Sequence, residues 1–143
     1  MKPAQPTIGV WIARHTIFVW LGVLLNLVFV VLLLFCPRWF LDLLGIPLQE
    51  LIWARIAGGL LLIISVFYVP AALDFGRYRA NAHIAVFPAR TFGAVFFFLA
   101  VFLFDQPPGF LVASLVDAFI GSITLYCLIR IKALEGRSSG VIR

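Results

Sequence analysis

Four long apolar runs, separated by short segments that hold many of the charged residues, dominate the sequence. A helix needs about 20 apolar residues to cross a hydrocarbon core about 30 Å thick, and each run is long enough. The runs do not alternate apolar with polar residues, as the strands of a membrane barrel do. The pattern therefore predicts an all-α, integral membrane four-helix bundle, in a single domain of residues 1–143. The expected spans are about 11–36, 48–73, 83–104 and 109–131.

The segments between the runs are short. Residues 36–50, CPRWFLDLLGIPLQE, predict a short helix on the membrane surface, with Pro37 in its first turn and Gly45 after its last. Residues 105–109, DQPPG, leave room for a tight turn and no more. The polar residues 132–143 predict a flexible tail.

The basic residues predict how the spans are oriented, because Lys and Arg beside spans stay on the cytoplasmic side. With the N-terminus inside, nine of the eleven lie on the inner flank, and only Arg38 and Arg55 lie on the outer one. We therefore expect a multi-pass membrane protein with both termini in the cytoplasm. The nine are Lys2, Arg14, Arg77, Arg79, Arg90, Arg130, Lys132, Arg137 and Arg143.

Composition agrees with this reading, since 64% of the residues are hydrophobic and 12% are charged. The formal net charge of +5 is explained by attraction to anionic lipid headgroups on the inner flank. Nucleic acid is therefore not an expected partner.

Four charged residues stand inside the runs or at their ends, where a lone charge is costly. Arg55 and Asp117 lie at similar expected depths from the outer side, and Asp74 and Arg90 at similar depths from the inner side. Matching depth predicts two ion pairs, Arg55 with Asp117 and Asp74 with Arg90. Such pairs either clamp helices together or form proton or anion sites, and the sequence leaves both open.

Small residues recur on the second and fourth runs, as Ala54 and Gly58 on one and Ala113 and Gly121 on the other. Small side chains allow two helices to approach closely in a membrane. The second and fourth spans are therefore expected to touch.

An inner-side polar cavity is expected between the second and third spans. Pro70 and Pro88 each remove a backbone N–H from a helix and bend it, at the depth of the expected inner pair. The expected lining and helix-bending residues are Asn26, Tyr68, Pro70, Asp74, Pro88 and Arg90.

Metal and enzyme chemistry find little support in the sequence. His15 and His83 both fall near the inner end of their spans and could in principle ligate a haem iron, but no C-x-x-C-H motif accompanies them. Zinc would need further ligands. Nucleophile elbows, phosphate loops and H-E-x-x-H motifs are missing from the sequence. No metal, no cofactor and no independent enzyme activity are therefore expected.

The stretch CPRWFLDLLGIPLQELIWARIAGGLLLIISVFYV, residues 36–69, resembles small bacterial four-helix membrane proteins of the DoxX-like group. In that group a surface segment leads to an arginine, a glycine three or four residues later and a long apolar span. Arg55, Gly58 and Gly59 match this pattern. The resemblance implies a four-helix bundle of the bacterial inner membrane, associated in some members with quinone-linked redox complexes.

Two classes of function remain open from the sequence. One is an accessory or assembly subunit, which docks to other membrane subunits or to copies of itself within the bilayer. The other is a binding protein or transporter for a lipid, a quinone or a small solute, held in the inner-side polar cavity.

Overall fold

The computed structural model describes residues 7–140, and the side chains up to residue 137. Lys2 and Arg143 of the expected inner flank lie outside the described residues. The chain is all-α, and four helical segments are long and apolar enough to cross a membrane. The helices are α1 (Ile8–Phe35), α2 (Pro37–Leu43), α3 (Leu51–Leu73), α4 (Arg79–Ile84), the π-helical turn η1 (Ala85–Arg90), α5 (Thr91–Leu103) and α6 (Phe110–Gly140).

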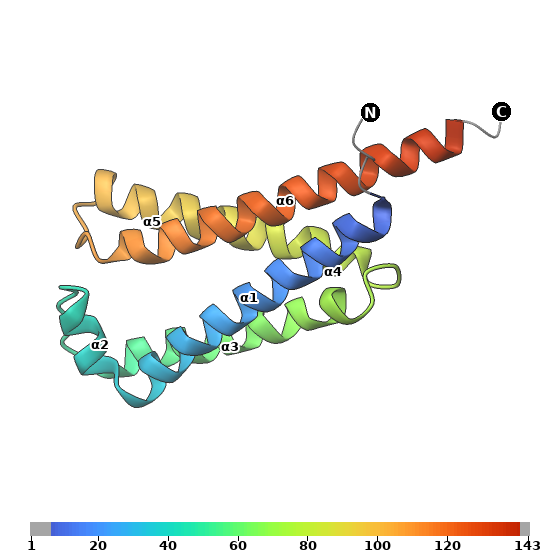
Figure 1. The fold of residues 1–143 in the computed structure, drawn as a ribbon. Helices are drawn as coiled ribbons and strands as arrows, with labels where there is room; N and C mark the ends of the chain where they lie inside the picture. Colours follow the sequence, from blue (N-terminus) through green and yellow to red (C-terminus); the bar gives the residue numbers. More distant parts are fainter. Residues whose placement is uncertain (1–6, 141–143) are drawn as a thin grey trace, which may run out of the picture.

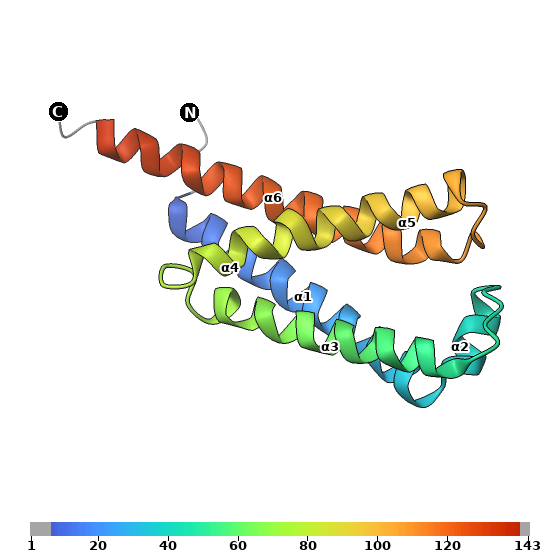
Figure 2. The same ribbon diagram turned by 180° about the vertical axis from the view of Figure 1, so that it is seen from behind.

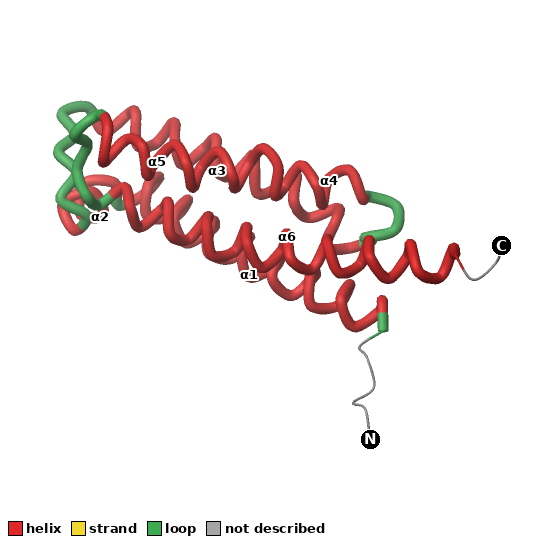
Figure 3. Tube along the Cα trace, turned by 90° about the horizontal axis from the view of Figure 1, so that it is seen from above, coloured by secondary structure: helices red, strands yellow, loops and turns green. Residues whose placement is uncertain are grey.

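The spans pack as two neighbouring pairs, α1 with α3 and α5 with α6, and α1 also contacts α6 (Figures 1 and 2). Both described ends of the chain lie at one end of the bundle, called here the terminal end. The short helix α2 lies at the opposite end, called here the α2 end, as Figure 3 shows from above. This confirms the all-α fold and the short helix between the first two spans.

The helix neighbours differ from the sequence expectation at one point. Gly58 of α3 faces Leu33 and Leu34 of α1, so its small face serves the α1–α3 contact. On α6, the Ser114 hydroxyl donates a hydrogen bond to the carbonyl of Ala94 in α5, at 2.7 Å. The second span was expected to touch the fourth, but it packs mainly on the first span, and the fourth packs mainly on the third and the first.

The third span is one kinked segment, Arg79–Leu103, made of α4, η1 and α5. Phe87 has an extended backbone inside it, with φ −118° and ψ 119°, and Pro88 has no N–H to donate. The Thr91 hydroxyl donates to the carbonyl of Val86 at 2.9 Å. Such replacement bonds are what allow a broken helix within a membrane bundle. Pro70, by contrast, lies within α3, which continues to Leu73.

The α2 end is closed by contacts from several elements. Gly45, at φ +64°, turns the chain after α2 in a conformation that favours glycine. A small apolar cluster there contains Leu41, Ile46 and Ala54. A Cβ added at Gly109, just before α6, would overlap the carbonyl of Leu44. The absence of a side chain at this glycine lets the α5–α6 turn meet the α2 segment.

At the terminal end, α6 runs nine residues beyond the expected boundary at Ile131 and stays helical to Gly140. The part of the expected tail that the structure describes is thus helical. Glu135 forms an ion pair with Arg79 of α4, with one Nη1–Oε2 bond of 3.1 Å. The main apolar cluster lies at the same end and joins all four spans through Trp11, Ala71, Phe75, Ala82, Val86, Cys127, Leu128 and Ile131.

Candidate functional site

The candidate site is an ion pair between Arg90 of η1 and Asp117 of α6, well inside the spans. The Arg90 Nη1 donates to Asp117 Oδ1 at 2.7 Å. The side chain of Arg90 is 4% exposed and that of Asp117 is 24% exposed. Charges at such a position are costly unless they are paired. The bond therefore compensates both groups and joins the third span to the fourth.

Three glycines from three helices make room for this pair. A Cβ on Gly22 of α1 would overlap the Arg90 guanidinium, and a Cβ on Gly93 of α5 would overlap the Asp117 carboxylate. A Cβ on Gly121 of α6 would lie 3.3 Å from the Cβ of Arg90, tighter than ordinary contact. We call Gly22, Gly93 and Gly121 the glycine cradle.

The second span contributes Tyr68, whose ring lies beside the Arg90 guanidinium at 5.3 Å from centroid to Cζ. Tyr68 is 5% exposed. A cation near an aromatic ring in such a desolvated place is attracted by the ring quadrupole. Through Gly22, Tyr68 and Asp117, Arg90 reaches every other span of the bundle.

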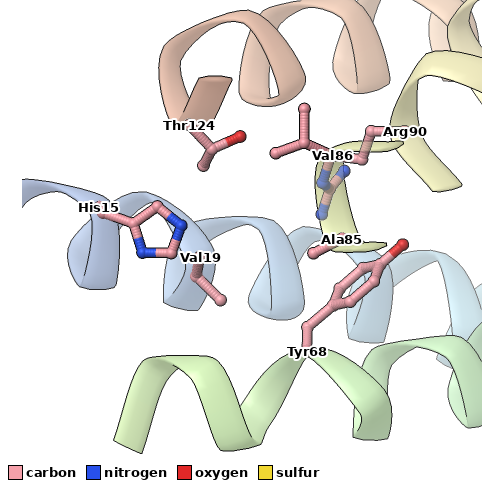
Figure 4. A pocket seen from close by; sticks show the side chains of 7 residues that line it. All are labelled: His15, Val19, Tyr68, Ala85, Val86, Arg90 and Thr124. Carbon is pink, nitrogen blue, oxygen red and sulfur yellow. The ribbon is translucent and has the colours of Figure 1, made fainter. Parts of the chain in front are cut away.

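A cavity of about 10 Å³ lies between His15 and Arg90 (Figure 4). That volume is about what one water molecule requires. His15 is fully buried, and neither ring nitrogen has a hydrogen-bond partner within the described chain. Its ring packs edge-on against Phe75, at 5.2 Å between centroids. The cavity is lined by His15, Val19, Tyr68, Ala85, Val86, Arg90 and Thr124.

The ion pairs expected from the sequence do not form. Arg90 and Asp117 pair with each other, although each was expected to have a different partner. Asp74 is exposed just after α3 and accepts a hydrogen bond from the backbone N–H of Arg77 at 3.0 Å. Arg55 is exposed on α3 and lines a groove at the α2 end.

The third span explains why Arg90 pairs with Asp117 and not with Asp74. It begins at Arg79 rather than near residue 83 and is broken at Phe87. Arg90 therefore lies eleven residues after the start of the span and beyond the kink, deeper than the sequence suggested. At that depth its long side chain reaches Asp117.

Six residues were expected to line an inner cavity or to bend the helices around it. Tyr68 and Arg90 line the observed cavity, and the other four do not. Pro88 is exposed and Pro70 is partly buried in α3. Asn26 points inward, as expected, but donates to Ser65 of α3 at 3.0 Å instead of lining the cavity.

The histidines have different environments. His83 is exposed on α4, and its Nδ1 lies 2.9 Å from the carbonyl oxygen of Arg79, whereas His15 is enclosed. The described residues contain no group of three or more side chains able to hold a metal ion.

Sequence reasoning singled out Gly121 only for helix contact, and it missed Gly22, Gly93 and the cavity-lining role of Thr124. The available signal for the cradle was the isolated glycines inside apolar runs, since such a glycine often marks a place where another group packs closely against the helix. Thr124 gave no such signal, because its hydroxyl bonds to carbonyls of its own helix, at 2.7 Å to Ile120 and 3.1 Å to Gly121.

Comparison of the chain with protein-family models, with curated proteins and with solved structures finds no match. The resemblance of residues 36–69 to DoxX-like proteins therefore gains no support from them. A small four-span membrane protein is what the helices themselves establish.

The Asn26–Ser65 bond gives a prediction for the α1–α3 contact. We expect Asn26→Leu to lower the free energy of unfolding by only about 0.6 kcal/mol, the average for a hydrogen bond between membrane helices. The loss is small because Ser65 keeps its bond to the carbonyl of Leu61, at 2.7 Å. Unfolding of the purified protein in mixed detergent micelles measures it. A loss above about 2 kcal/mol would show that Asn26 has a second role.

Proposed function

We propose that this chain is a non-enzymatic subunit of a larger membrane complex, which it joins through its membrane-embedded surface. The observation that supports this most is a contrast. The polar centre, which consists of the Arg90–Asp117 pair and His15, has a cavity of only about 10 Å³, whereas the exterior is widely apolar. A cavity of that size has no room for a lipid, a quinone or a small solute. Ligand handling in the expected inner cavity is therefore the weaker proposal.

The aromatic exterior of α5 supports docking. Phe92, Phe96, Phe98 and Phe102 are all exposed, and they form two close ring pairs, Phe92–Phe96 and Phe98–Phe102, with centroids 5.3 and 4.5 Å apart. At 3.6 residues per turn the two pairs lie about 120° apart around the helix, and we call Phe98 and Phe102 the α5 aromatic face. Rings that are already ordered against one another lose little freedom when a partner helix covers them.

The orientation proposed for this subunit has both termini in the cytoplasm of a bacterium.

The test is isolation of the tagged native chain in mild detergent, with a photo-crosslinking residue at Phe98 and, as a matched control, at the exposed Ile63 of α3. We expect one stoichiometric partner, crosslinked from position 98 and not from position 63. Quinone-linked redox complexes are the first partners to examine, because of the resemblance in residues 36–69. A homo-oligomer that carries an extractable quinone or small solute would instead support the ligand-handling class.

A proton-handling role for the polar centre is a second candidate, and it rests on one specific observation. Arg90 pairs with Asp117 and shares a cavity with His15, whose ring nitrogens have no hydrogen-bond partner among the described residues. Ionisable groups inside spans mark function by default. The variant Asp117→Asn separates the roles. A variant that folds normally but loses a proton-dependent activity supports this candidate, whereas a folding defect supports a clamp.

A further inference from the structure

A shallow, open groove of about 670 Å³ lies at the α2 end, and its lining shares no residue with the central cavity. The end of α1, the helix α2 and the start of α3 form its walls. Its lining residues are Phe35, Cys36, Pro37, Arg38, Trp39, Asp42, Leu51 and Arg55. Unlike the central cavity, it is large enough to receive part of a lipid molecule.

The charge of the groove favours an anion. Arg38 and Arg55 are both exposed, and neither has a hydrogen bond or an ion pair within the described chain. Asp42 supplies one carboxylate, so the lining carries two positive charges and one negative. A guanidinium presents planar N–H donors that match the oxygens of a phosphate.

The groove also has an apolar part that a soluble anion would not use. Phe35 is 76% exposed and Trp39 is 61% exposed. Tryptophan is enriched at the headgroup level of a bilayer, and the groove lies where two apolar spans meet the α2 segment. An acyl chain could follow the exposed apolar residues of α1 and α3 from this point.

We propose that the groove binds one phospholipid with an anionic headgroup, held through its phosphate by Arg38 and Arg55. The acyl chains lie against Phe35 and Leu51 and continue along the spans. This site is independent of the proposed subunit role, since it uses neither the α5 aromatic face nor the ion pair.

Native mass spectrometry of the full chain tests the proposal, with phosphatidylglycerol or phosphatidylcholine added to the detergent micelles. We expect one phosphatidylglycerol to be retained in preference to phosphatidylcholine. Each basic residue near a membrane surface contributes about a fivefold factor, so the double variant R38Q/R55Q should lose about 25-fold in apparent affinity. D42N should bind more tightly, because it removes the opposing carboxylate.

The control variant is R77Q, in the exposed loop at the terminal end, which should retain the lipid like the unaltered chain. Inorganic phosphate at millimolar concentration should not displace the lipid. Equal retention by R38Q/R55Q and the unaltered chain, a similar loss in R77Q, weaker binding by D42N, or displacement by phosphate alone would each overturn the proposal. Far-ultraviolet circular dichroism of every variant establishes that the helices are intact.

Discussion

Asp117→Ala is expected to lower the free energy of unfolding by about 3–5 kcal/mol, the largest effect of any substitution considered. The change leaves Arg90, which is 4% exposed, without its carboxylate partner inside the bundle. A buried charge that has lost its partner costs about this much, whereas the intact pair contributes little net stability. The expected loss is therefore mainly a penalty on the remaining guanidinium.

Denaturant titration in mixed micelles measures this loss, and a double variant tests its cause. Arg90→Met combined with Asp117→Leu removes both charges and fills similar volume. We expect it to recover most of the stability lost by Asp117→Ala, because an apolar pair needs no compensation. A double variant as unstable as the single one would contradict this explanation, because no unpaired charge remains in it. If instead it is stable but a measured activity of the native complex is lost, the pair has a functional role.

Gly93→Ala is expected to cost about 1–3 kcal/mol, the usual range for an extra methyl group in a filled interior. The added Cβ would overlap the Asp117 carboxylate and push it away from Arg90. The matched control is Gly59→Ala on α3, where a Cβ would meet nothing within 4 Å. That control should be neutral or stabilising by up to about 1 kcal/mol, since alanine is the better helix former.

A double-mutant cycle shows whether Gly93 acts through the ion pair. In the Asp117→Ala background the carboxylate is gone, so Gly93→Ala should cost far less there than in the unaltered chain. Sites in direct contact show such coupling, and distant sites add independently. An unchanged cost in both backgrounds would mean that Gly93 is required by helix packing alone.

The spans and the short helix could be predicted from the sequence, because their causes are local. Run length decides whether a helix can cross a bilayer, and Pro37 and Gly45 mark the limits of α2 within their own neighbourhood. The inward direction of Asn26 was predictable for the same reason, since an amide in lipid has no partner. The predicted ends of the helices were less exact. The third span begins earlier than expected and α6 ends later.

The pairing of charges was decided by the tertiary structure alone. Depth along a span can be counted from the sequence, but the direction that a side chain faces depends on how every span packs against the others. Arg90 meets Asp117 because the kink at Phe87 sets its depth and because Gly22, Gly93 and Gly121, from three helices, leave the space. Arg55 and Asp74 have the same chemistry, yet they lie exposed. The sequence by itself determined an all-α protein with four spans, and packing among them determined which of its charges meet.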